Sequence, residues 1–262
     1  MKKLFAGVLC LALLVGSLGA QDKDKKASAA GDPKTVVLAK NVDANSVGLP
    51  KPAMDLKAGE YKYKAMIEIS GQQIPLNVLT SIKEDGGAWM ATDTLDTPNG
   101  TVVQSASLEK GTLIMRKLTV KQGQGPVAIE LSFTDSKASG NITMGGQDRP
   151  VAVDLGGPIF ADGPAAKQSI SCLPLAEGYT TTYRNFDVQK QKAQLLQLKV
   201  TGKEKVTVPA GTFDTYKVEI TSADGGADKE TLWITPDTHQ PVKESAVIAS
   251  MGGAVLTQEL MP

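Results

Sequence analysis

From residue 60 onward, apolar side chains recur at every second position in short segments, and this period constrains the fold more than any other feature. The first segment is EYKYKAMIEIS, residues 60–70, where aromatic and aliphatic residues alternate with Lys and Glu. Residues 71–73, Gly-Gln-Gln, then turn the chain, and the period resumes from Ile74 to Ile82. A period of two is typical of strands with one buried face. The pair therefore predicts an antiparallel hairpin.

Similar units continue to the C-terminus, each bounded by Gly, Asp, Asn or Pro. Strand-length pieces at a spacing of roughly 8 to 12 residues indicate an all-β architecture. We predict a mainly β fold, a curved antiparallel sheet in the form of a half-barrel or open barrel, with one or two short helical segments. The segment VTVPAGTFDTYKVEI, residues 206–220, contains a Pro-Ala-Gly break. Because Pro cannot donate to a sheet ladder and Gly admits positive φ, this break is interpreted as a corner between strands and not as a site.

One segment lacks the alternation. Residues 157–178 are rich in Ala and Pro, and their middle, residues 164–171, favours a short helix with Pro164 in its first turn. The segment separates two strand-rich halves of similar length. We interpret it as a crossover within a single β domain, residues 35–262, with a division into two domains as the alternative.

The N-terminus has the layout of a secretory signal peptide. Lys2 and Lys3 precede an apolar run, small residues follow, and the chain then becomes strongly polar. We predict a signal peptide over residues 1–20 and a flexible tether over residues 21–34, which are charged and small. The run is shorter than the ~18 to 20 residues that span a bilayer, so no membrane-spanning segment is expected after cleavage. The expected location is the periplasm or the medium, with association at the outer membrane left open.

Charge and residue types exclude several functions. Removal of residues 1–20 leaves 26 basic and 28 acidic residues, a balance that offers no handle for nucleic acid. One histidine, His239, and one mature cysteine, Cys172, are too few for a zinc site. His239 lies in a Pro- and Asp-rich turn and is interpreted as an exposed loop residue. We expect no catalytic residue, no metal and no cofactor. A hydrolase using carboxylates such as Asp93, Asp96 or Asp214 is the weaker alternative.

Apolar and aromatic residues in the alternating segments are the remaining candidates for a ligand site. Methionine and tryptophan recur in separate strands, and methionine adapts to varied ligands. Ordinary core filling is favoured over a lipid-lined cavity, although a curved sheet closing over a helix commonly leaves a pocket at its mouth. The candidates for the concave face are Tyr61, Tyr63, Ile67, Leu76, Trp89, Met115 and Trp233.

An ordered series of short motifs carries a family resemblance. Residues 173–178 read Leu-Pro-Leu-Ala-Glu-Gly, and residues 208–214 read Val-Pro-Ala-Gly-Thr-Phe-Asp. A Lys-Val-Glu strand, a Trp strand ending in Pro and a Pro-Val-Lys segment follow. This order, over about residues 157–247, resembles an uncharacterised family of exported bacterial domains of unknown function. That family is distantly similar to half-barrel lipoprotein carriers and lipid-binding envelope proteins. The resemblance implies a curved sheet around short helices and supplies no catalytic residues.

Two hypotheses follow. The first is an exported, non-enzymatic envelope protein that binds a lipid or another apolar ligand on the concave face of its sheet. The second is a structural or protein-interaction module with a solid core and an envelope protein as its partner.

Overall fold

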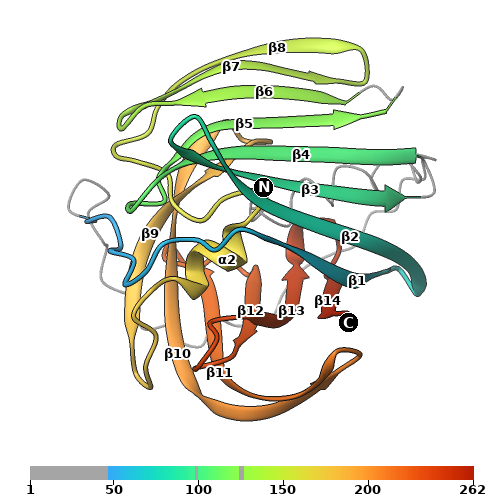
Figure 1. Cartoon of the computed structure of the whole chain (residues 1–262). Helices are drawn as coiled ribbons and strands as arrows, with labels where there is room; N and C mark the ends of the chain where they lie inside the picture. The colour runs from blue at the N-terminus through green and yellow to red at the C-terminus, as the bar shows by residue number, and fades with distance from the viewer. Residues whose placement is uncertain (1–46, 98–99, 124–126) are drawn as a thin grey trace, which may run out of the picture.

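The computed structural model describes residues 47–97, 100–123 and 127–262. In these ranges the chain forms one antiparallel sheet of 14 strands, one α-helix and one short 3-10 helix (Figure 1). The predicted signal peptide (1–20), tether (21–34) and first residues of the predicted domain (35–46) lie outside the described residues. The elements are β1 Gly59–Ile69, β2 Gln72–Asp85, β3 Ala88–Thr97, β4 Gly100–Glu109, β5 Met115–Gln122, β6 Ala128–Phe133, β7 Lys137–Met144, β8 Gln147–Asp154, α2 Ala166–Ser171, β9 Thr180–Asp187, β10 Lys192–Val208, β11 Gly211–Ser222, β12 Lys229–Ile234, β13 Pro241–Ile248, η3 Ala249–Met251 and β14 Ala254–Leu260.

The sheet consists of two meanders joined through the first and last strands. Its order is β8-β7-β6-β5-β4-β3-β2-β1-β14-β13-β12-β11-β10-β9. Strands β1 and β14 pair antiparallel, with Tyr63 opposite Leu260. In the described ranges β8 and β9 each pair on one side only, so the sheet is not closed. The predicted fold class, a curved antiparallel sheet with short helical segments, is confirmed.

Strand alternation and bulges account for the curved shape. In β1, inward Tyr63, Ala65 and Ile67 are buried while Lys62 and Lys64 are exposed. The register of β10 with β11 shifts between Val200 and Gly202. Such bulges bend a strand and increase its twist, and the register of β4 with β5 shifts in the same way. The inner face of the curved sheet therefore encloses one continuous apolar cluster.

The segment between β8 and β9 fills the concave side of the sheet. The backbone N–H of Met115 donates to the Ile159 carbonyl at 3.0 Å, and that of Phe160 donates to the Arg184 carbonyl at 2.9 Å. The crossover is thus hydrogen-bonded to both halves of the sheet, and α2 lies inside the curve (Figure 1). Buried apolar side chains anchor it to the common core: Leu155, Ile159, Phe160, Ile170, Leu173 and Leu175. The predicted short helix over residues 164–171 is present as α2, two residues shorter at its N-terminus.

The Pro-Ala-Gly break turns β10 into β11, as predicted. Val208 pairs with Gly211, which leaves Pro209 and Ala210 as the turn. Gly211 has φ +140, a value that favours glycine. The N–H of Ala210 donates to the carbonyl of Leu260 at 3.0 Å, so the turn is tied to the end of β14. The break therefore serves chain reversal.

None of the helices in the described ranges combines the length and the hydropathy that a bilayer crossing requires.

Candidate functional site

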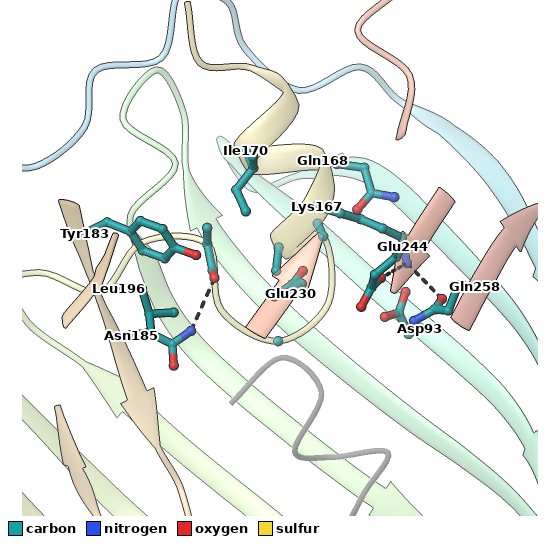
Figure 2. Close-up of a pocket in the computed structure, with 14 residues that line it drawn as sticks. Asp93, Lys167, Gln168, Ile170, Tyr183, Asn185, Leu196, Glu230, Glu244 and Gln258 are labelled. Atoms are coloured by element: carbon teal, nitrogen blue, oxygen red, sulfur yellow. Dashed lines mark hydrogen bonds and ion pairs between the residues drawn. The ribbon is translucent and has the colours of Figure 1, made fainter. Parts of the chain in front are cut away.

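A small cavity lies between α2 and the inner face of the sheet. Its volume is about 40 Å³. It collects side chains from the crossover and from strands that are far apart in the sequence (Figure 2). Unlike the surrounding core, its wall is mostly polar: Asp93, Lys167, Gln168, Tyr183, Asn185, Glu230, Glu244 and Gln258, with Ala161, Gly163, Ala165, Ala166, Ile170 and Leu196 completing it.

Lys167 is the only basic side chain among the residues that line this cavity. It extends from α2, and its Nζ lies 3.3 Å from Glu244 Oε2 and 2.9 Å from Gln258 Oε1. Nζ also lies 4.2 Å from the ring centroid of Tyr63, a favourable cation–π distance. Lys167 is 8% exposed. A lysine is almost never this buried unless its charge is paired, and these contacts supply the pairing.

Three carboxyl groups share the cavity with this one ammonium. Glu244 is opposite Gln258 in the β13–β14 register, and Glu230 projects from neighbouring β12. Asp93 projects from β3, where the Thr80 hydroxyl donates to its Oδ1 at 2.6 Å. With all groups ionised, the wall would carry a net charge of about −2, which burial strongly disfavours.

Burial shifts the protonation of these groups. It raises the pKa of Glu230 to about 8, and the negative charge of Glu244 acts in the same direction. Burial also raises the pKa of Asp93, although Lys167 and the Thr80 hydroxyl oppose the shift. The pKa of the Tyr63 phenol is raised by burial and by the charges of Asp93 and Glu244. The cavity therefore favours a protonated Glu230 carboxyl near neutral pH.

A fourth acid, Asp162, is buried beside this cavity and anchors the crossover. Asp162 Oδ2 accepts a hydrogen bond from the Phe186 N–H at 3.0 Å, and Oδ1 accepts one from the Gly163 N–H at 2.8 Å. Burial raises the pKa of Asp162 to about 7, while these two hydrogen bonds act in the opposite direction. Asp162 thus links the start of the helical segment to β9.

The three acids considered for a hydrolase, Asp93, Asp96 and Asp214, do not lie together in the structure. Asp93 lines the cavity, whereas Asp96 is exposed on β3 and Asp214 is exposed on β11, where it pairs with Lys205 at 2.8 Å. Within the described part of the chain, no group of three or more His, Cys, Asp or Glu side chains is placed to hold a metal ion. What the cavity offers chemically is a set of hydrogen-bond acceptors and carboxyl groups that can exchange protons.

Six of the seven predicted concave-face residues face inward. Ile67, Leu76 and Met115 are buried in the core. Tyr63 closes one side of the polar cluster, with its hydroxyl donating to the Pro241 carbonyl at 3.1 Å. The remaining two lie near the N-terminal lead-in: Trp89 Nε1 donates to Asp55 Oδ1 at 2.5 Å, and Tyr61 is half-buried. None of these contacts tests whether the residues bind a ligand.

The prediction for Trp233 is corrected by the structure. Glu230, Leu232 and Ile234 face inward along β12, so Trp233 lies on the outer face. Its indole N–H donates to Glu204, and Lys243 lies over its ring at 5.8 Å. Because Leu232, Trp233 and Ile234 are consecutive apolar residues, their alternation could not be phased from the sequence.

His239 is also less exposed than predicted. It does lie in the turn before β13, with φ +53. Its ring is half-buried, and Nδ1 donates to the Ser171 carbonyl at the end of α2 at 2.7 Å. The histidine therefore holds the helix in place.

The sequence contains a signal for the polar cavity that strand periodicity alone does not reveal. In PVKESAVI, residues 241–248, the inward positions are Val242, Glu244, Ala246 and Ile248. Glu244 is therefore a charged residue at an inward position whose neighbours are apolar. Gln258 in β14 is likewise a polar residue at an inward position, after the inward residues Ala254 and Leu256. A charged or amide residue at an inward position indicates a buried polar contact. No periodic signal identifies Lys167.

The solved structures that this chain matches are distant in sequence. A β-barrel-like protein of the DUF1849 family from Brucella abortus is 10% identical, with a TM-score of 0.50, and the match covers 80% of this chain and 98% of that one. The hypothetical lipoprotein YmcC from Escherichia coli is 12% identical, with a TM-score of 0.32, over 77% and 84% of the two chains. A DUF1329 family protein from Desulfovibrio piger is 13% identical, with a TM-score of 0.31, over 78% and 84%. The Brucella protein is thus similar in fold.

Comparison with the curated proteins gives no match. The model of one family, described as a protein of unknown function (DUF3108), matches residues 53–259. This range runs from the lead-in before β1 into β14 and so includes the crossover and every side chain of the polar cavity. The resemblance to an uncharacterised family is confirmed: the chain belongs to the DUF3108 family of proteins of unknown function.

Proposed function

We propose that this chain is an exported, non-enzymatic protein of the cell envelope that acts as a protein-interaction module with a filled interior. Export is supported by the signal-like N-terminus, with its two lysines, apolar run and small residues. A non-catalytic role is supported by the position of the three suspected acids, of which only Asp93 reaches the cavity.

The packing on the concave face favours the interaction module over the lipid-binding protein. Pockets for small organic ligands usually measure about 300–1,000 Å³, whereas the cavity under α2 measures about 40 Å³. Ile67, Leu76 and Met115 are each at most 4% exposed and belong to one core cluster with the crossover. A lipid chain would have to displace the crossover to reach them, which would expose buried side chains of that segment to water.

Native mass spectrometry of the mature protein, residues 21–262, followed by organic extraction, tests this proposal. We expect the mass of the bare chain and no uptake of a hydrophobic dye. A stoichiometric lipid in the extract would contradict the filled-interior module and support the lipid-binding hypothesis.

Two variants determine where on the protein any such lipid is bound. Leu76→Trp enlarges a side chain on the concave face, whereas Trp233→Ala changes one on the outer face. Loss of lipid in the first variant alone would place the ligand on the concave face. If neither variant changes the amount, the lipid is bound elsewhere.

A further inference from the structure

The middle of the crossover differs in composition from its two ends. We call residues 163–171, GPAAKQSIS, the plug. Seven of these nine residues are buried, yet Ile170 is the only large apolar side chain among them. The polar contacts of Lys167 over the cavity and the contact between His239 and the Ser171 carbonyl tie the plug to the sheet. Because burial of apolar surface is the main stabilising force in a core, the plug is a weakly stabilised part of this one.

The backbone is strained where the plug begins. Ala161 and Ala165 have φ of +48 and +64, in the left-handed region that residues other than glycine rarely occupy. Ala165 is also the N-cap of α2. An alanine has no side-chain oxygen with which to accept a hydrogen bond from the first turn, whereas Ser, Thr, Asp and Asn stabilise this position. The helix in the plug therefore starts without a cap and after two unfavourable backbone conformations.

The plug also buries polar atoms that have no partner. Ser169 is 1% exposed and Gln168 is 4% exposed, and within the described ranges neither Ser169 Oγ nor Gln168 Oε1 has a hydrogen-bond partner. A buried polar atom of this kind is destabilising, because it has lost its hydrogen bonds to water and gained none in return. Both atoms would be hydrogen-bonded if the plug were in contact with water.

Hydrogen bonds fix the chain on either side of the plug. Before it, Asp162 Oδ2 accepts a hydrogen bond from the Phe186 N–H at 3.0 Å. After it, the Cys172 carbonyl accepts one from the Ala53 N–H of the lead-in at 2.8 Å. A segment with fixed ends, few apolar contacts and a strained backbone belongs to the low-stability parts of a fold, which open locally while the rest stays folded.

We propose that the plug is a lid built into the fold: residues 163–171 swing away from the sheet as a unit, about hinges at Asp162 and Cys172, while the strands and the ends of the crossover stay folded. In the closed state the plug lies inside the curve of the sheet (Figure 1), with Lys167 paired over the cavity (Figure 2). Opening admits water to the cavity, relieves the backbone at Ala165 and hydrates the unpaired oxygens. Because the closed state keeps the interior filled, the lid is independent of the interaction role proposed above.

Amide hydrogen exchange of the mature chain, followed by NMR, tests the lid. The Ala166 and Ser169 N–H groups are hydrogen-bonded within the plug at 3.2 and 2.8 Å, and the Phe160 N–H is hydrogen-bonded to β9 at 2.9 Å. We expect Ala166 and Ser169 to share one opening constant, larger than that of Phe160 by roughly 100-fold or more. Low concentrations of urea should accelerate Phe160 more steeply, because its exchange requires more surface to be exposed. Equal opening constants in the plug and at Phe160 would overturn the proposal.

Variants separate opening of the lid from global unfolding. Gly140→Ala places a Cβ 2.0 Å from the Glu130 carbonyl oxygen, in strands that stay folded when the plug opens. It should speed exchange at Phe160 and leave the plug amides unchanged, and equal acceleration of both would show that the plug opens only when the whole chain unfolds.

Two serines in α2 test the strain itself. Ser169→Ala removes a buried hydroxyl without a partner within the described ranges, so it should slow exchange of the plug amides by about threefold or more. Ser171→Ala is the matched control, because the Ser171 hydroxyl is also buried but donates to the Gln168 carbonyl at 2.7 Å. It should speed the exchange, and the same direction of change in both variants would contradict the role of the unpaired oxygen.

Chemical modification locates the hinge after the plug. Lys167 is 8% exposed within the plug, and Cys172 is 4% exposed at its end. Reductive methylation of the native protein, which keeps the lysine charge, should modify Lys167 at a rate that follows the opening constant from hydrogen exchange. A thiol reagent should leave Cys172 unlabelled under the same conditions. The proposal fails if Lys167 reacts only in denaturant, and the hinge at Cys172 is excluded if both residues react in the native protein.

Discussion

Replacement of Lys167 by Met tests whether the buried polar cluster holds α2 against the sheet. Lys167 is 8% exposed and Glu244 is 7% exposed, so the change leaves a carboxylate without its cation in the interior. Removal of one partner of a buried pair costs about 3–5 kcal/mol, and we expect a loss of that size at pH 8. Urea denaturation with an unchanged m-value measures it.

The loss should depend on pH. Burial raises the pKa values of Asp93 and Glu230, and removal of Lys167 raises them further. At pH 5 the Glu230 carboxyl, whose pKa is about 8, is protonated in the native state, so the variant should lose less stability than it loses at pH 8. The double variant Lys167→Met with Glu244→Gln should recover most of the stability, because a neutral pair leaves no uncompensated charge.

The matched control is Lys205→Met. Lys205 pairs with Asp214 at 2.8 Å, but the two side chains are 63% and 79% exposed. Exposed pairs contribute about 0–1 kcal/mol. A loss for Lys167→Met no larger than this control at pH 8, or equal losses at pH 5 and pH 8, would refute the account of the cluster as a desolvated charge network.

Three further predictions follow from the cluster and the sheet. Burial raises the native pKa of Glu230 to about 8, above the ordinary value of about 4.3, so the native state binds this proton more tightly than the unfolded state. Its contribution to the free energy of unfolding therefore falls as pH rises from about 4 to 8; Glu230→Gln should flatten that slope in urea titrations, and an unchanged slope would contradict the shift. Gly140→Ala should destabilise by at least about 2 kcal/mol, because φ is +144 and a Cβ would lie 2.0 Å from the Glu130 carbonyl oxygen. The control Gly202→Ala, with no atom within 4 Å of its Cβ, should change stability by about 0.5 kcal/mol or less, and equal midpoints for the two would argue against the close strand approach. Cys172 is 4% exposed and burial raises its pKa to about 12, so a thiol reagent at pH 8 should label the mature protein only in denaturant; rapid labelling of the native protein would show that the lead-in and helix open readily.

The strands and turns were predictable because their determinants are local. The β1–β2 hairpin follows from alternation on either side of a glycine turn, and the structure places Ser70 and Gly71 between the two strands. The β10–β11 turn follows from Pro209, whose ring fixes φ and removes the N–H donor, and from Gly211, which adopts a positive φ because it has no Cβ. The short helix and the crossover between two strand-rich halves were visible as a loss of alternation.

The composition of the polar cavity was not predictable, because it depends on which strands become neighbours. Asp93, Glu230 and Lys167 are separated by long stretches of sequence and meet only because β1 pairs with β14 and the crossover folds into the concave side. Each of the acids could be recognised as a charge at an inward position. Its partners could not be identified before the strand order was known.

The orientation of Trp233 and the position of the crossover depend on tertiary structure and not on local sequence. The amino-acid pattern by itself determined a mainly β chain of alternating strands with an interrupted middle, since the period of two is a property of each strand alone. It did not determine that Trp233 faces outward, because three consecutive apolar residues fit either phase and only pairing with β11 and β13 selects one. Nor did it determine that residues 155–175 fill the concave face, because the same residues could connect the two edges of a sheet around a ligand. That outcome depends on long-range packing: Ile159 and Phe160 hydrogen-bond to both halves of the sheet, and the volume left beneath α2 is only about 40 Å³.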